Sequence, residues 1–466
     1  MATRQRLYNG VRFPMEAPSP DNVARLDHFA RPYMRACMDI GMQIDPDHFY
    51  ALEKTLVEDM DRITEEVKTL TGQYTNLDSG PQVSTLLFKT LGLKQARLKM
   101  TKSGDRESVE NEVLVAIQHD HPVVPKILDF KELSKLKGTY VKPIPKLAQK
   151  VGGKWRLFPK LGDTRIPSGR QNCKEPNLLA MPNRTERARQ VIEGFITDDE
   201  WVYVSIDESQ IEPRVVAHRS GDPALRQIYF NEEDIYSDFA ISAFKLQDQR
   251  YQDEAGWHYP GVHKKKHRFP SKTCVLAAIY DVTNVGLLEQ MPTVCRNCEK
   301  EATLHDCAKF QPLWNEDNCQ DIINAFYKKY IGILPMRKTD HARAKRYGYI
   351  WDEWGRLLHT TAVRSVLEWV VAAALRETGN FPIQSTAQGT VKLVMAQSED
   401  DRRGMGLTEL VWPQLQIHDE LLYVCHTSVA DDWAAHVSSL FERCVELAVP
   451  IKAGSAQGRT WGSVPK

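Results

Sequence analysis

The sequence has no long apolar run and no excess of charge of either sign. Its 466 residues include 61 Lys and Arg against 61 Asp and Glu, and 42 % are hydrophobic. This balance excludes a mainly disordered, collagen-like or disulfide-stapled chain. Glu368 interrupts the most apolar stretch, 366–375, which is in any case shorter than the roughly 18 residues of a membrane helix. The polar start lacks a signal peptide, so we expect a cytoplasmic protein without a membrane partner.

Cysteines are few for the length of the chain. Nine cysteines without an export signal indicate reduced thiols, with a metal site as the exception. The exception to consider is a C-x2-C-x6-H-x-C pattern formed by Cys295, Cys298, His305 and Cys307. These four side chains could bind Zn²⁺ tetrahedrally, in a structural site that leaves no ligand position open. A structural zinc site and a loop of reduced thiols both remain open.

The pattern of apolar residues predicts a mixture of long helices and few strands. Residues 45–70 place Phe49, Leu52, Leu56, Met60, Ile63 and Val67 at helical spacing. Alternation predicts a strand over 201–207 and two short strands over 414–425 that meet at residues 418–420. Further helices are expected over 262–290, 318–330, 361–378 and 428–447. The expected fold class is α+β.

One stretch of the chain, 126–160, is strongly basic. Asp129 and Glu132 are its only acids. Its ten basic residues are Lys126, Lys131, Lys135, Lys137, Lys142, Lys146, Lys150, Lys154, Arg156 and Lys160. Such a run is commonly a solvated face. Spaced two to five residues apart, these charges could also follow a phosphate backbone without choosing a base sequence.

Two aspartates stand where strands are predicted to end or turn. Asp207 ends the strand 201–207, and Asp419 lies between the two later strands. Structural roles are also open. An aspartate at the end of a strand, such as Asp207, can cap the next helix, and Ser209 to Glu212 has the pattern of a helix capping box. Asp419 suits a hairpin turn. The alternative is a shared site for divalent cations, which prefer carboxylate oxygens.

A cationic helix lies between these aspartates in the sequence. Arg268, Lys272, Leu276 and Tyr280 recur every four residues and therefore share one helical face. Arginine offers a planar fork for phosphate, and lysine offers a point charge. An ordinary amphipathic helix with solvated cations is the alternative.

Together these motifs resemble those of family A DNA polymerases, the bacterial polymerase I type. The similarity runs from about Met38 to the end of the chain, and its order makes coincidence improbable. The matching segments are Leu133 to Tyr140, Ser168-Gly-Arg170 with Pro176-Asn-Leu, Asp207 to Asp222, Arg268-x3-Lys272-x3-Leu276-x3-Tyr280, Arg376-x3-Asn380-x-Pro-Ile-Gln384 and Gln416 to Glu420.

The resemblance implies a right-hand fold of palm, fingers and thumb. Its expected parts are an N-terminal segment (1–40), a thumb (41–150), the first part of the palm (151–240), fingers with the cysteine-rich insertion near 295–307 (241–362), and the second part of the palm (363–466). Its expected reaction is attack of a primer 3′-hydroxyl on a dNTP, with primer-template DNA and dNTPs as partners.

The resemblance also implies roles for individual residues around two Mg²⁺ ions. Asp207, Asp419 and the backbone carbonyl of Glu208 would hold the ions. Arg268 and Lys272 would bind the β- and γ-phosphates, with Lys272 a proton donor to the leaving group. Tyr280, Glu212, Leu276, His418 and Gln210 would surround the nucleotide, Glu212 by excluding a ribose 2′-hydroxyl. Arg170, Arg376, Asn380 and Gln384 would contact the minor groove, and Lys135 and Lys137 the DNA backbone.

Four positions depart from the family pattern. Glu208 replaces a tyrosine, Leu276 an aromatic residue, Asp281 a glycine and Pro213 an apolar residue. These changes suggest a divergent member, of viral or otherwise specialised origin. They also motivate a second hypothesis, a catalytically silent polymerase-fold protein that only binds DNA. An RNA polymerase or reverse transcriptase is a third, against which Glu212 argues.

About 40 residues precede the thumb-like helix, too few for an exonuclease domain. We therefore expect no proofreading within this chain. A separate exonuclease or processivity factor is the partner that this expectation implies.

Overall fold

The computed structural model describes residues 5–95, 99–101, 103–163, 166–182, 185–291 and 313–465. Within these ranges the chain combines long helices with short antiparallel strands, which confirms the expected α+β class. No helix among the described residues is both long and apolar enough to span a bilayer.

A four-stranded antiparallel sheet lies at the centre of the structure, in the order β13–β14–β8–β15. Its strands are β13 (Val411–Ile417), β14 (Glu420–His426), β8 (Trp201–Glu208) and β15 (Ala453–Gly458). The predicted strand 201–207 and the predicted pair of strands over 414–425 are therefore confirmed. Successive side chains of a strand point to opposite faces of a sheet. Accordingly Val204 and Ile206 belong to one hydrophobic core, and Tyr203 belongs to another.

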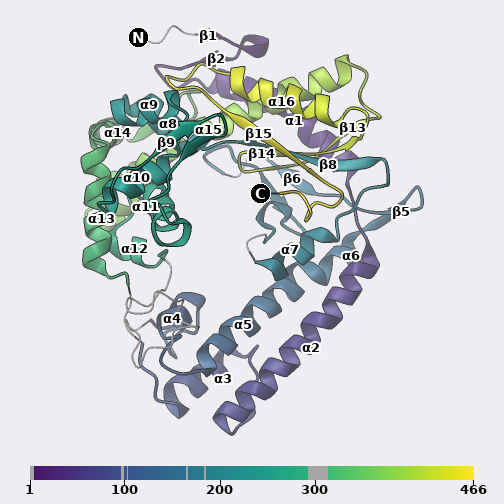
Figure 1. The fold of residues 1–466 in the computed structure, drawn as a ribbon, viewed down its shortest axis with the longest axis vertical. Helices are drawn as coiled ribbons and strands as arrows, with labels where there is room; N and C mark the ends of the chain where they lie inside the picture. The colour runs from purple at the N-terminus through teal and green to yellow at the C-terminus, as the bar shows by residue number, and fades with distance from the viewer. Residues whose placement is uncertain are drawn as a thin grey trace.

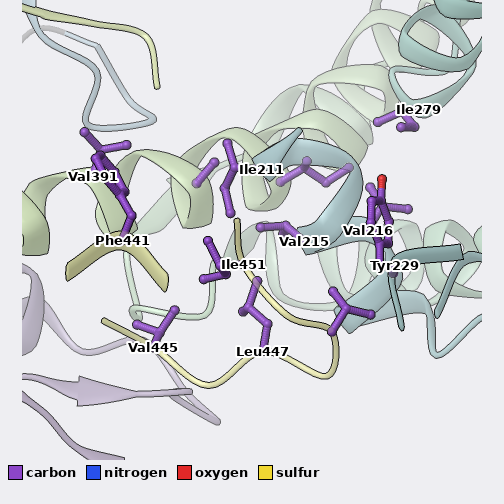
Figure 2. Close-up of a cluster of buried hydrophobic side chains, with 14 of the residues drawn as sticks. Ile211, Val215, Val216, Tyr229, Ile279, Val391, Phe441, Val445, Leu447 and Ile451 are labelled. Atoms are coloured by element: carbon purple, nitrogen blue, oxygen red, sulfur yellow. The ribbon is translucent and has the colours of Figure 1, made fainter. Parts of the chain in front are cut away.

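The first core joins the sheet to the helices drawn above it and to its left in Figure 1. These helices are α1 (Pro20–Ile40), α8 (Ile211–Ser220), α9 (Pro223–Phe230), α10 (Ile235–Ala243), α11 (Phe269–Ile279), α12 (Asn284–Leu288), α13 (Glu316–Lys329), α14 (Ile333–Tyr347), α15 (Glu368–Gly404) and α16 (Ala430–Arg443). Figure 2 shows Ile211 and Val215 of α8 near its centre, with Ile451 and Leu447 below them and Phe441 farther to the left in the same cluster. The helix that follows β8 is thus fixed from several sides.

The second core packs against the other face of the sheet and continues into the lobe drawn at the bottom of Figure 1. Its helices are α2 (Pro46–Thr71), α3 (Gly80–Ser84), α4 (Asn111–Ala116), α5 (Val123–Leu136), α6 (Pro143–Leu147) and α7 (Glu186–Glu193), with π-helical turns η2 (Thr85–Thr90) and η3 (Lys137–Val141). All six apolar residues predicted to form the stripe of the helix 45–70 are buried in α2. Asp45 caps this helix by accepting a hydrogen bond from the Asp47 N–H at 3.0 Å.

Short pairs of strands complete the described part of the fold. They are β1 (Gln5–Arg6) with β2 (Arg12–Phe13), β6 (Lys160–Gly162) with β7 (Asn172–Lys174), β9 (Tyr251–Asp253) with β10 (Gly256–His258), and β11 (Tyr349–Trp351) with β12 (Leu357–His359). The remaining small sheet pairs β5 (Lys154–Leu157) with both β3 (Met42–Gln43) and β4 (Gln149–Val151).

The helix predicted over 361–378 was wrong in its bounds. A 3-10 turn, η6 (Thr361–Arg364), comes first, and α15 then runs for 37 residues to Gly404. Gly379 and Pro382 normally signal the end of a helix. Both are buried inside α15, so tertiary packing overrides their local preference.

The helix predicted over 262–290 is divided. It consists of a π-helical turn, η5 (Lys264–Arg268), then α11 and α12. Asp281 separates the last two with a φ of +59°, a conformation that L-residues other than asparagine and aspartate seldom adopt. Its carboxylate pairs with Arg337 Nη1 at 2.6 Å.

Candidate active site

The two predicted aspartates meet at one end of the central sheet. Asp207 is the penultimate residue of β8, and its Cα is aligned with Glu420 of β14 and Gly454 of β15. Asp419 immediately precedes β14, and its carbonyl accepts a hydrogen bond from the Glu208 N–H at 3.2 Å. Residues that are far apart in the sequence are therefore neighbours on adjoining strands.

Negative charge is concentrated at this end of the sheet. Burial raises the pKa of Asp419, and the nearby carboxylates of Glu212 and Glu420 raise it further. Asp207 is exposed, whereas Asp419 is half-buried. Like charges brought together disfavour ionisation unless a cation balances them, and carboxylate oxygens are the donors that Mg²⁺ prefers. The donor set therefore fits a divalent cation.

The two glutamates beside these aspartates point in different directions. Glu420 is buried, and its Oε1 accepts a hydrogen bond from Ser205 Oγ at 2.7 Å. Glu208 follows Asp207, so its side chain lies on the opposite face of the strand. That side chain is fully buried, and neither of its oxygens has a hydrogen-bond partner among the described residues. Burial, with Asp419 as the next cause, raises the pKa of Glu208 well above its ordinary value.

Glu212 does not cap a helix but connects the first turn of α8 to Arg170 and Tyr280. Its Oε1 accepts a hydrogen bond from Arg170 Nη2 at 2.6 Å, and its Oε2 accepts one from the Tyr280 hydroxyl. The expected capping box of Ser209 and Glu212 was wrong. Gln210 occupies the N-cap of α8 with a φ of +57°, and no side chain caps that end. Because that left-handed residue shifts the start of the helix, the Glu212 side chain can reach out of the first turn.

Tyr280 ends α11 directly beside this cluster. Burial raises the pKa of its hydroxyl, and the Glu212 carboxylate adds to the rise. The Gln384 side chain lies close enough to the hydroxyl to lower its pKa. Arg376 and Asn380 precede Gln384 at intervals of four residues on α15, so the three share one helical face. The structure thus brings Glu212, Arg170, Tyr280 and Gln384 together.

The cations of the predicted phosphate-binding helix lie around another aromatic ring. Arg268, the last residue of η5, places its Cζ 5.3 Å from the centroid of the Tyr236 ring. Lys272 of α11 is exposed and places its Nζ 5.6 Å from the same centroid. Leu276 is half-buried and packs against the first core. The electrostatic influence of Glu212 and Asp419 on Tyr236 shows that this group adjoins the acidic end of the sheet.

Two further predicted nucleotide-binding residues occupy left-handed backbone positions. His418 is exposed, has a φ of +57°, and its carbonyl accepts a hydrogen bond from Gln416 Nε2. Gln210 uses its Oε1 to accept a hydrogen bond from the Tyr229 hydroxyl at 3.3 Å. Both residues lie at turns that flank the aspartates.

Not every predicted residue belongs to this group. Lys135 is exposed near the end of α5, and Lys137 begins η3, both in the lobe of the second core. Cys295, Cys298, His305 and Cys307 lie outside the described residues, so the zinc site stays a prediction.

Asp234 and Tyr236 are residues that the sequence analysis missed. Asp234 caps α10, and Tyr236 is that helix's second residue. An aspartate before an apolar helix is a common capping signal, and nothing local in the sequence shows that it also binds an arginine 34 positions later.

A palm-like antiparallel sheet with acids at one end, flanked by two helical lobes, defines a right-hand polymerase. The chain belongs to DNA polymerase family A, because the model of that family matches residues 46–463. Over 90 % of its length the chain is 31 % identical to the thermostable DNA polymerase I of Thermus thermophilus and 28 % identical to DNA polymerase I of Deinococcus radiodurans. It spans 46 % and 40 % of those relatives.

A solved structure supports the same fold. It is the POL domain of Pol1 from M. smegmatis in complex with DNA primer-template and dNTP. The TM-score is 0.79 at 22 % identity, and the match covers 95 % of this chain and 72 % of that one. The expected right-hand fold is therefore confirmed.

Proposed function

We propose that the protein is a template-directed DNA polymerase that adds dNTPs to a primer 3′-hydroxyl. The observation that carries this proposal is the adjacency of Asp207 and Asp419 at the end of the central sheet. A protein that only bound DNA would have no need for two carboxylates in a place where they repel each other.

Asp207 and Asp419 would hold the metal ions, with the Glu208 carbonyl as a further ligand. When bound, two Mg²⁺ ions supply activation of the primer hydroxyl and stabilisation of charge on the leaving pyrophosphate. The buried Glu208 side chain lies on the other face of β8 from Asp207. We therefore assign no metal contact to that carboxylate.

Arg268 and Lys272 would bind the β- and γ-phosphates of the nucleotide. Both cations flank the ring of Tyr236. Two successive helical turns therefore each bring a positive charge to this ring. The guanidinium matches phosphate oxygens as a fork, and the ammonium adds a compact charge and a proton. Leu276 and Tyr280 continue the same surface toward the sugar and the base, next to Gln210 and His418.

Primer-template DNA would contact two separate regions. Arg170, Arg376, Asn380 and Gln384 would lie against the minor groove of the terminal base pairs, where acceptors are shared by all correct pairs. Lys135 and Lys137 would contact the phosphates farther along the duplex. In this proposal the thumb (41–150) would comprise most of the second core's lobe, the palm (151–240 and 363–466) would contain the sheet, and the fingers (241–362) would contain α11–α14.

Primer extension tests the proposal directly. The intact protein, supplied with Mg²⁺, a primer-template and dNTPs, should lengthen the primer by copying the template. Binding of the primer-template without any extension, at every dNTP concentration, would instead support the silent DNA-binding alternative. Replacing dNTPs by NTPs in the same assay should abolish most of the product, and efficient NTP use would indicate an RNA polymerase.

Glu212 should determine the choice of sugar. In Glu212→Ala, removal of the side chain that closes the space between Arg170 and Tyr280 should admit a 2′-hydroxyl. We expect the ratio of kcat/KM for dNTP over NTP to fall by about a hundredfold, the scale of steric discrimination in a pocket. The ratio should be measured by steady-state single-nucleotide insertion.

Two variants control this experiment. Glu212→Gln keeps the volume of the side chain and should retain most of the discrimination. Glu232→Ala removes an exposed glutamate that pairs with Lys452, and it should leave the ratio unchanged. An unchanged ratio in Glu212→Ala would assign Glu212 a structural role only.

A further inference from the structure

Arg268 is bound to a carboxylate in this structure. Its Nε donates to Asp234 Oδ2 at 2.8 Å, and its Nη2 donates to Asp234 Oδ1 at 3.1 Å. Two parallel N–H bonds to two oxygens are the same geometry in which a guanidinium binds a phosphate. Asp234 thus occupies the edge of the guanidinium formed by Nε and Nη2, two of the five N–H donors of Arg268.

Asp234 is held in place by contacts that do not involve Arg268. As the N-cap of α10, its Oδ2 accepts a hydrogen bond from the Ser237 N–H at 2.9 Å. Its own N–H donates to the Tyr259 hydroxyl at 3.0 Å. The carboxylate would therefore stay where it is if the arginine moved away.

Arg268 has a second anchor that does not use its hydrogen-bond donors. Its Cζ lies over the ring of Tyr236, which also adjoins Lys272. Burial raises the pKa of Tyr236 to about 12, so the ring remains a neutral support for both cations. The guanidinium could therefore exchange one anion for another while remaining in contact with the ring.

We propose that Asp234 is an internal competitor for the incoming nucleotide and thereby lowers the affinity of the site for dNTPs. The triphosphate must replace the carboxylate at Arg268 before the nucleotide is fully bound. This inference rests on the proposed function, because that function assigns Arg268 to the phosphates. Its consequence is selective binding, since only a ligand with enough negative charge can displace Asp234.

The ion pair is partly exposed, with 38 % of the Arg268 side chain and 23 % of the Asp234 side chain accessible. Solvent weakens such a pair, so the competition must be moderate and reversible. In a positioning role, by contrast, Asp234 would aim Arg268 at the phosphates and stay bound to it. The two roles predict opposite effects of removing the charge.

The test is Asp234→Asn, in which the side-chain oxygen can still cap α10 while the negative charge is lost. Competition predicts that the Kd for dNTP, measured on a complex with a dideoxy-terminated primer, falls about threefold to tenfold. The KM should fall with it while kcat is unchanged. Inhibition by inorganic tripolyphosphate should strengthen by the same factor, because that probe carries only the phosphates.

Two controls separate competition from other effects. Asp248→Asn removes a carboxylate that pairs with Arg250 instead, and it should change neither constant. In an Arg268→Ala background, Asp234→Asn should have no further effect, because the guanidinium for which the anions compete is gone.

A higher or unchanged Kd for dNTP in Asp234→Asn would overturn the inference and leave a positioning or purely structural role. Since the binding measurement needs no turnover, it remains decisive even if primer extension fails. Failure of the proposed function would appear separately, as wild-type protein that binds tripolyphosphate through Arg268 but never extends a primer.

Discussion

Asp419→Ala should abolish primer extension, reducing kcat by about a thousandfold or more. Metal ions at a reacting phosphate contribute several kcal/mol to the transition state, and each 1.4 kcal/mol corresponds to about a factor of ten in rate. The loss follows from the position of Asp419, whose backbone already adjoins Glu208 at the end of β8. Single-turnover extension with excess enzyme is the appropriate measurement, because it does not depend on product release.

DNA binding should survive in the same variant. The proposed DNA contacts are Arg170, the face of α15 and the lysines of the second lobe, and none of them requires the Asp419 carboxylate. The matched control is Asp199→Ala, an exposed aspartate just before the opposite end of β8, for which both activity and binding should be normal. Wild-type turnover by Asp419→Ala would remove this residue from the metal site.

Arg219→Met should be the most destabilising of the substitutions considered, with a loss of about 3–5 kcal/mol in the free energy of unfolding. The Arg219 side chain is 6 % exposed and pairs with Asp340 at 3.1 Å and Glu353 at 3.0 Å. Asp340 is 2 % exposed, so removal of the arginine would leave a buried carboxylate without its counter-charge. Urea denaturation monitored by tryptophan fluorescence would measure the loss.

Two comparisons make this prediction specific. Arg35→Met breaks the exposed pair with Asp39, in which the side chains are 73 % and 57 % accessible, and it should cost less than about 1 kcal/mol. The double variant Arg219→Met with Asp340→Leu should recover most of the stability, because the fully buried carboxylate is removed together with its counter-charge and only Glu353, which is 21 % exposed, loses its partner. A loss no greater than that of Arg35→Met would show that Asp340 is easily neutralised or hydrated.

Local patterns correctly predicted the elements whose buried side chains recur at a single period, either that of a helix or that of a strand. The stripe on α2 is an example, since helical spacing alone selects the six residues that α2 buries. Strand β8 is another, because alternating residues enter two different cores. Where local signals conflicted with packing, as at Gly379 and Pro382 inside α15, the prediction of a helix end was wrong.

The candidate site, like the fold, was only partly predictable from local patterns. The order and spacing of motifs led to the proposal that Asp207, Asp419, Arg268, Lys272 and Tyr280 belong to one polymerase site. Spacing could not show that Glu212 accepts hydrogen bonds from Arg170 and Tyr280, and it favoured a capping role for Ser209 and Glu212 that the left-handed Gln210 prevents.

The sequence by itself therefore determined the fold class, the family and the chemical types of the site residues, because periodicity and motif order are properties of neighbours along the chain. Only the tertiary structure decided which charges meet. The pairs of Arg268 with Asp234 and of Arg219 with Asp340 join separate helices or turns. Such contacts depend on how elements pack in space, which no local spacing encodes.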